Sequence, residues 1–437
     1  MEKGQPTFNS LTPFLIFVSL FLYSTLCTHQ SISSLFCAII ALSYAIVFPL
    51  TSRTGFNDRI ALFIAGSAHP TAIATCYILL FSAIFTHIVN VIGGTHNAVH
   101  IGMHLLPTQF LLPGFFTVIS LFATAIGSSM GAIAAFLPIG IGIGTQLHIN
   151  PALISGIVVS GAMLGDNLSI ISDTTLAATQ ATHCAMKDKF WANLWLVIPA
   201  FVCTIIVLIW INSTIITATY VPTTGHIQLQ QLITIIPYLV LFVLAPFNID
   251  VIFLLIIGIA TAIVIGITQQ HFTLSESSMI IFEGFSKNTS IQEVFLLVLF
   301  VAGIAHIVEH QGGIAYVCNK IAPHITTKSS AECAIALLVF LVNAVVAINT
   351  IAILLTGPVA RHIALKAGIA KERVASLIDI VACICQGILP YAPQLLLAAS
   401  LASISPTAII PYLHYQWFIL AVTVLSIGRT YYYQPAT

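Results

Sequence analysis

GDNLSIISDTT, residues 165–175, places two carboxylates and four hydroxyl groups inside a long apolar part of this chain. An aspartate at the centre of a bilayer costs roughly 2.5–3.5 kcal/mol on insertion scales. Acidic groups at that depth normally face a polar cavity and handle ions or protons. We therefore predict a transport site around Asp166 and Asp173. The alternative interpretation is that one of the two aspartates caps a helix at a loop.

The composition of the 437-residue chain indicates a membrane protein. Hydrophobic residues make up 58% of it and charged residues 6%, whereas a soluble domain carries about 25% charged residues. The net charge is zero, so nothing indicates a nucleic-acid partner. The sequence has no HExxH motif and no phosphate-loop motif, and we therefore predict neither an enzyme nor a primary pump. We expect no cofactor.

Apolar stretches predict an all-α polytopic fold of about 10–14 membrane segments, since a spanning helix needs about 20 residues. The first series of stretches is Leu11–Cys27, Ser31–Leu50, Thr71–Ile92, Phe110–Ile126, Met130–Thr145, Ala152–Ala185 and Trp191–Ser213. The second series is Leu232–Ala245, Val251–Ile267, Val294–Val308, Ala334–Ile348, Ile351–Leu365, Val374–Ser403 and Leu413–Ser426. The two series are alike in order and length, which indicates a repeat.

Self-comparison favours a duplication. Leu80–Gly94 aligns without gaps on Leu299–Gly313, with eight identities in fifteen positions and His87 opposite His306. An imidazole inside a span either relays protons or is a neutral core residue bonded to a carbonyl, and we expect the second.

The halves, residues 1–230 and 231–437, are predicted to be inverted-topology repeats. Lys and Arg favour cytoplasmic loops, and the basic loops alternate between the halves. The residues concerned are Arg53, Arg59, Lys187 and Lys189 in the first half and Arg361, Lys366, Lys371 and Arg373 in the second. This alternation predicts an odd number of passes in each half, with re-entrant hairpins, and both termini in the cytoplasm. Inverted repeats with broken helices are typical of secondary transporters, whose site lies near the midplane.

Oxygen-bearing side chains gather at the predicted helix breaks, which free backbone carbonyls inside the bilayer. Hard cations such as sodium prefer oxygen ligands. The predicted ion and proton ligands are Asp166, Asp173, Asn167, Ser169, Ser172, Thr174 and Thr175. An unbroken helix would place the two aspartates on one face, and a break would let them approach and titrate as a pair. We expect no metal site other than this sodium site.

A second set of polar residues is predicted to support this site or to line a path for substrate. Its members are Ser128, Ser129, Asn349, Asp379, Gln386, Tyr391 and Gln394. Two alternatives stay open: the serines serve close helix packing, and Asp379 is the ion-pair partner of Arg373.

Residues 165–175 resemble the GD-x-x-SP-x-SDTT signature of the NhaC-type sodium/proton antiporter family, in the ion transporter superfamily. Residues 124–129 are similar to its TGSS element, and residues 377–379 and 389–391 to its E-D and IPW segments. The resemblance implies a cation/proton exchange site built around Asp166 and Asp173.

The second half departs from that family's pattern. Ile378 stands where the family has a glutamate, residues 349–350 replace an acidic D-Q pair, and Ile170 replaces a proline of the first motif. Relatives in this family also exchange organic acids or amines. We therefore expect sodium/proton antiport by alternating access in the cell inner membrane, or else sodium- or proton-coupled transport of a small organic acid or amino acid. The expected partners are sodium, protons and the lipid bilayer; an organic solute and a homodimer stay open.

Overall fold

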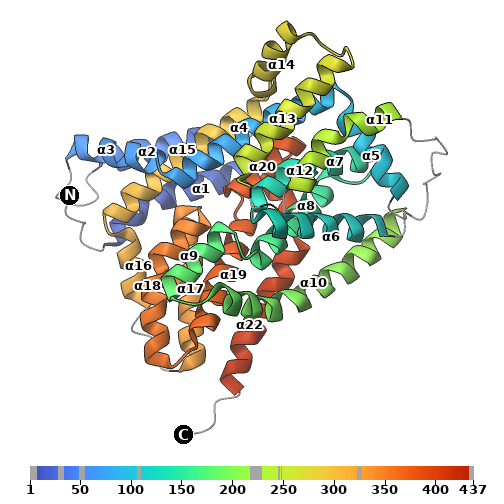
Figure 1. The fold of residues 1–437 in the computed structure, drawn as a ribbon. Coiled ribbons are helices and arrows are strands. Elements are labelled where there is room, and N and C mark those ends of the chain that lie inside the picture. The colour runs from blue at the N-terminus through green and yellow to red at the C-terminus, as the bar shows by residue number, and fades with distance from the viewer. Residues whose placement is uncertain are drawn as a thin grey trace.

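The computed structural model describes residues 7–27, 34–48, 55–105, 110–216, 229–244, 247, 249–321 and 327–432. These residues form a helical bundle without β-strands (Figure 1), which confirms the predicted all-α fold. Eight of the described helices are long and apolar enough to cross a membrane, or nine if one bent pair is a single span. Three shorter apolar helices, Phe8–Ser24, Leu35–Val47 and Leu111–Ile126, bring the number into the predicted range. The chain is a multi-pass membrane protein.

Helices of similar length follow one another in the same order twice. The first series is α1 (Thr12–Cys27), α2 (Ser34–Val47), α3 (Phe56–Ser67), α4 (Pro70–Val91), α5 (Gly94–Leu105), α6 (Leu111–Ile126), α7 (Ser129–Gln146), α8 (Pro151–Leu168), α9 (Asp173–Thr182) and α10 (Met186–Ile216). The second series is α11 (Leu229–Thr234) with α12 (Ile236–Leu244), α13 (Val251–Thr268), α14 (Leu274–Ser286), α15 (Thr289–His310), α16 (Gly313–Ile321), α17 (Lys328–Val346), α18 (Asn349–Ala367), α19 (Lys371–Ile388), α20 (Pro393–Ala402) and α22 (His414–Tyr432). The division at residue 230 and the inverted orientation stay predictions.

Two short helices that the hydropathy pattern did not predict join the halves. α3 packs against α15 and α14 packs against α4 (Figure 1). A Cβ on Gly66 of α3 would lie 2.4 Å from the Cβ of His306, and a Cβ on Gly284 of α14 would lie 3.2 Å from the Cβ of His87. Equivalent glycines therefore let each half approach the other closely. At 12 and 13 residues, these helices are too short to be recognised as spans.

Arg59, which was predicted to be a charge in a loop, lies inside the structure and stabilises the end of α2. Arg59 is buried, and its Nη1 donates to the carbonyls of Ile46 at 2.7 Å and Phe48 at 2.8 Å. These are unpaired carbonyls at the end of α2, which a cationic donor stabilises. Arg53 lies outside the described residues.

The break between α8 and α9 is stabilised by its own hydroxyl groups. Ser172 Oγ accepts a hydrogen bond from Thr175 N at 3.2 Å and so caps α9. Ser169 Oγ accepts from Ile171 N at 3.3 Å, and Thr175 Oγ1 donates to Ser169 O at 2.8 Å. Because the bilayer offers no water to freed backbone groups, these short polar side chains make the interruption tolerable.

The break between α19 and α20 uses proline instead. Pro390 and Pro393 have no N–H group, so two potential donors are absent from the interruption. The remaining amides of Leu389 and Ala392 bond to Cys385 O and Leu389 O, each at 3.0 Å. The two breaks therefore stand at corresponding places but have different local chemistry.

We predict that Gly165→Ala lowers the free energy of unfolding by about 1–3 kcal/mol, through overpacking where α8 meets α6. A Cβ on Gly165 would lie 2.4 Å from the Cβ of Ala123 and 2.6 Å from Ser120 O. The measurement is thermal unfolding in detergent. The control is Gly428→Ala in α22, where no atom lies within 4 Å. Equal melting temperatures for the two variants would contradict the packing argument.

Candidate functional site

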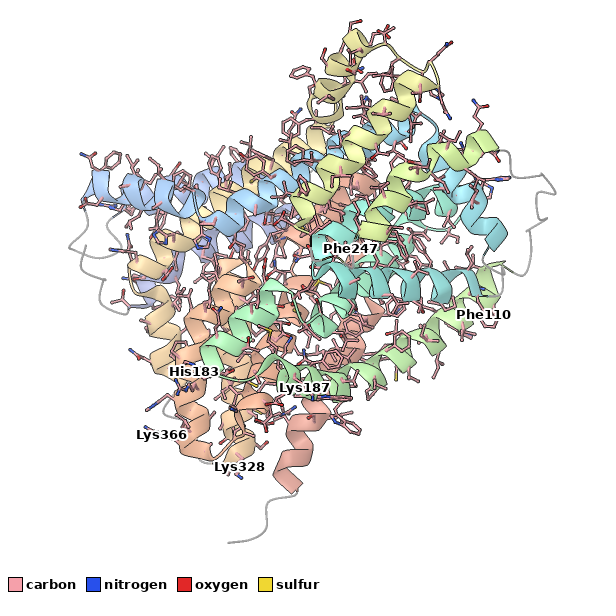
Figure 2. All side chains as sticks on the ribbon, viewed as in Figure 1. Phe110, His183, Lys187, Phe247, Lys328 and Lys366 are labelled. Atoms are coloured by element: carbon pink, nitrogen blue, oxygen red, sulfur yellow. The ribbon has the colours of Figure 1, made fainter. Side chains whose placement is uncertain are left out.

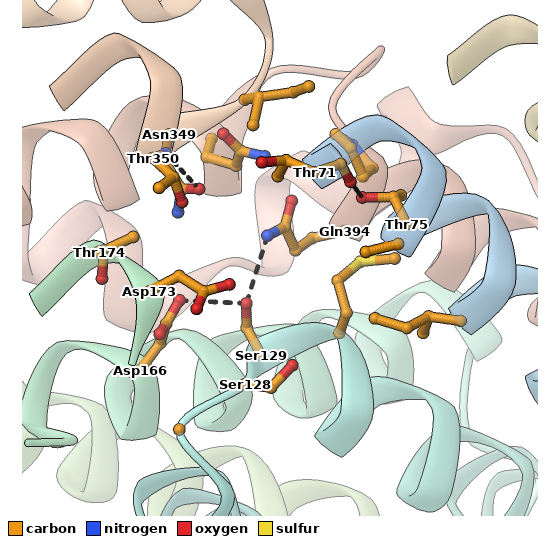
Figure 3. Close-up of a pocket in the computed structure, with 17 residues that line it drawn as sticks. Thr71, Thr75, Ser128, Ser129, Asp166, Asp173, Thr174, Asn349, Thr350 and Gln394 are labelled. Carbon is orange, nitrogen blue, oxygen red and sulfur yellow. Dashed lines mark hydrogen bonds between the residues drawn. The ribbon is translucent and has the colours of Figure 1, made fainter. Parts of the chain in front are cut away.

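A partly open cavity of about 90 Å³ lies where the two helix breaks meet the tips of the α6–α7 and α17–α18 hairpins (Figure 3). That volume is enough for several water molecules or for a cation with ligands. The predicted residues that line it are Ser128, Ser129, Asp166, Asp173, Thr174, Asn349, Gln386 and Gln394. Residues far apart in both halves of the sequence thus come together at one place.

Asp166 and Asp173 point into this same cavity (Figure 3). Asp166 is 5% exposed and accepts a hydrogen bond from Ser129 Oγ at 3.2 Å. Asp173 is the first residue of α9 and is more exposed. Because Ser172 caps that helix, the alternative that an aspartate serves as the cap is wrong. Both carboxylates remain free to bind a ligand in the cavity.

A hydrogen-bonded chain crosses from the second half of the sequence to the first. Gln394 Nε2 donates to Ser129 Oγ at 3.2 Å, and Ser129 in turn donates to Asp166 (Figure 3). Ser129 begins α7, Gln394 lies in the first turn of α20, and Asp166 lies in the last turn of α8. The serine therefore bonds to side chains of both halves at the cavity and is more than a small residue for helix packing.

Four helices begin at the cavity. Its lining includes the first residues of α7, α9, α18 and α20. Each helix N-terminus carries a partial charge of roughly +0.5 elementary charge. Together these ends face the two carboxylates and offset part of their negative charge.

Two amide oxygens in the cavity have no hydrogen-bond partner among the described residues. They are Gln386 Oε1 and Gln394 Oε1, on side chains that are 2% and 4% exposed. A buried acceptor without a partner is unfavourable unless a ligand or water completes it. With the two carboxylates they form a set of hard oxygen donors, the type that sodium prefers.

Four members of the predicted ion-binding set lie outside the cavity lining. Ser169, Ser172 and Thr175 make the bonds of the α8–α9 break described above, and Asn167 Nδ2 donates to the hydroxyl of Tyr415 at 2.8 Å. The structure thus places them in the framework that holds the aspartates.

Tyr391 is also directed away from the cavity. Its ring packs edge-on against Phe14, Phe17 and Phe21 of α1, with centroid distances of 6.0, 5.6 and 5.9 Å. Its hydroxyl donates to Ala344 O at 2.9 Å, near the end of α17. The side chain therefore fixes the α19–α20 break to its neighbours.

Asp379 makes an ion pair that the sequence did not predict. Its Oδ2 lies 2.6 Å from Lys189 Nζ, and the two side chains are 0% and 1% exposed. Arg373 instead bonds to Glu332, at 3.1 Å and 2.9 Å. The alternative of an Asp379–Arg373 pair is therefore wrong, and so is the interpretation of Lys189 as a loop charge.

Sequence reasoning missed three threonines at the cavity, Thr71 and Thr75 of α4 and Thr350 of α18. Thr71 and Thr75 stand four residues apart and share a face of their helix. The presence of two hydroxyls on one face, near the start of an apolar span, was the only feature of the sequence that could have indicated that α4 lines the cavity.

The repeat-related histidines lie outside this cavity, and each faces a glutamate. His87 Nε2 is 3.8 Å from Glu283 Oε2, and His306 Nδ1 is 3.7 Å from Glu309 Oε2. Their side chains are 31% and 36% exposed. The expectation of core histidines bonded to carbonyls is therefore wrong for both.

Comparison with known proteins finds similarity to antiporters, both in a family model and in individual proteins. Residues 7–213 match the Na+/H+ antiporter family. The chain is 23% identical over 415 residues to the Na(+)/H(+) antiporter NhaC of Alkalihalophilus pseudofirmus, covering 89% of this chain and 88% of that protein. It is 18% identical over 359 residues to the malate-2H(+)/Na(+)-lactate antiporter of Bacillus subtilis, covering 76% of each. The resemblance to the NhaC-type family is confirmed.

Among solved structures, the Alcanivorax borkumensis YdaH transporter has a TM-score of 0.43 and 15% sequence identity, covering 97% of this chain and 99% of that one. This score is too low to assign a fold.

We predict that Ser129→Ala lowers the free energy of unfolding by about 1–3 kcal/mol, because it leaves buried polar partners without a hydrogen bond. The partners are Asp166 and Gln394. Thermal unfolding in detergent is the measurement. Ser155→Ala is the matched control, since this buried hydroxyl bonds only to Pro151 O in its own helix. Identical melting temperatures for both variants would contradict the bridging role of Ser129.

Proposed function

We propose that this relative of the NhaC-type antiporters is a secondary transporter that exchanges sodium for protons across the cytoplasmic membrane. The observation that carries the proposal is the pair of carboxylates, Asp166 and Asp173, in one small cavity inside an apolar helical bundle. Ionisable groups in such a place mark ion and proton pathways. Its sequence relatives, two antiporters named for sodium and protons, support the same activity.

In this proposal one site serves both ions by competition. Sodium is bound by ionised carboxylates together with the amide oxygens of Gln386 and Gln394, which have no other partner. Protons added to Asp166 and Asp173 remove the negative charge that attracts the cation. Loading either ion therefore expels the other, and exchange follows when the loaded site is exposed to each side in turn.

Alternating access requires the cavity to lie between parts that move relative to one another. Its walls come from both halves, because α4 and α7–α9 face α18–α20 across it. The Gln394–Ser129 bond joins the two walls directly. We propose that this bond and the two hairpin tips change partners as the site switches sides, as broken helices do in other inverted-repeat transporters.

The distribution of basic residues suggests an orientation. Lys187, Lys328 and Lys366 lie at the same end of the molecule, beside the turn at His183 (Figure 2). By the preference of basic residues for the cytoplasmic side, we propose that this end faces the cytoplasm. An odd number of passes in each repeat would then place both termini on that side as well.

We predict that Asp166→Asn and Asp173→Asn each abolish sodium-driven proton movement. Each variant loses a negative charge needed to hold the cation and a group that can carry the proton. The measurement uses proteoliposomes with an internal pH dye that are pulsed with external sodium. In the wild-type protein, internal alkalinisation should follow the pulse, and each variant should match protein-free liposomes.

The matched control is Asp188→Asn, which changes an exposed aspartate at the start of α10. This variant should exchange ions at the wild-type rate. Unaltered exchange in both cavity variants would overturn the assignment of the site, and no sodium response in the wild-type protein would overturn the function.

Coupled transport of a small organic acid is the second candidate, for a specific reason. Four helix N-termini at one cavity form a setting that also suits a carboxylate ligand, and one relative is named a malate-2H(+)/Na(+)-lactate antiporter. The neutral polar wall made by Asn349, Gln386 and Gln394 is the surface that would contact such a solute.

We predict that, if this second function holds, lactate or malate raises the melting temperature of the purified protein in the presence of sodium. The increase follows from ligand binding to the folded state alone. Gln386→Leu should abolish the increase, because it removes an amide from the neutral wall. A melting temperature that responds to sodium and not to either acid would leave cation/proton exchange as the function.

A further inference from the structure

The ion pair between Lys189 and Asp379 is the most completely buried one among the described residues. Its Nζ–Oδ2 distance is 2.6 Å, with exposures of 1% and 0%. The other ion pairs in the described part of the chain have at least one side chain that is 21% exposed or more. The pair also connects the halves, because Lys189 belongs to α10 and Asp379 to α19.

Lys189 bonds directly to the segment that carries the cavity aspartates, and Asp379 is linked to the same segment through Asn193. Lys189 Nζ donates to Thr175 Oγ1, which itself donates to Ser169 O at 2.8 Å. Asn193, one turn after Lys189 in α10, donates through Nδ2 to Asp379 Oδ2 at 2.8 Å and to Asn167 O at 2.7 Å. The network therefore holds the chain immediately before, within and after the α8–α9 break.

The pair also determines how much charge the cavity contains. Asp166 interacts electrostatically with Asp379, Lys189 and Asp173. Because Lys189 compensates Asp379, the uncompensated carboxylates that line the cavity are Asp166 and Asp173, and the exposed Asp250 acts on Asp173 from outside the lining. Without the lysine, the fully buried carboxylate of Asp379 would be a third carboxylate acting on the same site. A buried charge that loses its partner is strongly unfavourable, whereas loss of both partners is tolerated far better.

We propose that Lys189 and Asp379 are positioning residues of the ion site. Together they hold the α8–α9 break in place, and Lys189 neutralises the carboxylate of Asp379 so that this carboxylate takes no part in the exchange. This inference rests on the proposed function. The pair acts on transport through Thr175, Asn193 and the charge that it cancels, and neither member lines the cavity. The other ionisable side chains near the pair are Asp166 of α8, Cys383 of α19 and Tyr415 of α22.

The test compares the variants Lys189→Met, Lys189→Arg and the double variant Lys189→Met with Asp379→Leu. Lys187→Met is the control, since Lys187 is an exposed lysine two positions earlier in the same helix. Each protein is examined by thermal unfolding and by sodium-driven proton movement in proteoliposomes, over a range of sodium concentrations and pH.

For Lys189→Met we expect a lower melting temperature, a rise of about tenfold or more in the apparent KM for sodium, and a displaced pH profile. The double variant should regain the wild-type pH profile and most of the melting temperature, because the third carboxylate is gone. It should keep a raised KM, since the contact with Thr175 is still missing. Lys189→Arg should restore activity in part, and Lys187→Met should match the wild-type protein.

Two results would overturn the inference. A folded double variant without exchange at any pH would mean that the pair itself carries the ion or proton. A Lys189→Met variant with a lower melting temperature but wild-type KM and pH profile would mean that the pair only stabilises the fold. If the wild-type protein shows no sodium response, the proposed function fails instead, and the melting temperatures still report whether the network joins the halves.

Discussion

Every polar backbone group inside the bilayer must find a partner within the protein, and this constraint shapes the centre of the molecule. Two broken helices meet there, and each needs its own means of pairing the freed groups. The α8–α9 break uses the hydroxyls of Ser169, Ser172 and Thr175. The α19–α20 break reduces the number of donors with two prolines. Since each break starts a new helix, both direct a helix N-terminus at the same cavity.

The charges at the centre fall into two groups because of that arrangement. Asp166 and Asp173 face the cavity and the helix N-termini, so that a mobile ion can reach them. Asp379 does not line the cavity and bonds to Lys189 and Asn193 instead. The α8–α9 segment carries the two cavity aspartates and is also bonded to Lys189 and Asn193, so a displacement of the segment would affect both groups of charges together.

Sequence alone predicted the helical class and most polar residues of the cavity's walls, though not Thr71, Thr75 and Thr350, because polar groups in the middle of a span are rare and conspicuous. It did not predict which of them face inward. Tyr391 and Asp379 are on broken or buried helices, as expected. The direction of the Tyr391 side chain, however, depends on Phe17, and that of Asp379 depends on Lys189, both of them far away in the chain. One signal was present and unused: Lys189 and Asn193 are spaced to share a helix face, which favours a common partner.

The tips of the α6–α7 and α17–α18 hairpins show that the two halves supply different groups to the cavity. Ser129, at the start of α7, donates to Asp166, whereas the Asn349 side chain at the start of α18 accepts from Thr350 N. Both cavity carboxylates belong to the first half, and the second half supplies neutral amides. In the proposed exchange, a cation between the two walls is therefore attracted mainly to the wall of the first half. When the walls separate, the ion should remain with α8 and α9, and the amides of the second half are the ligands exchanged for water.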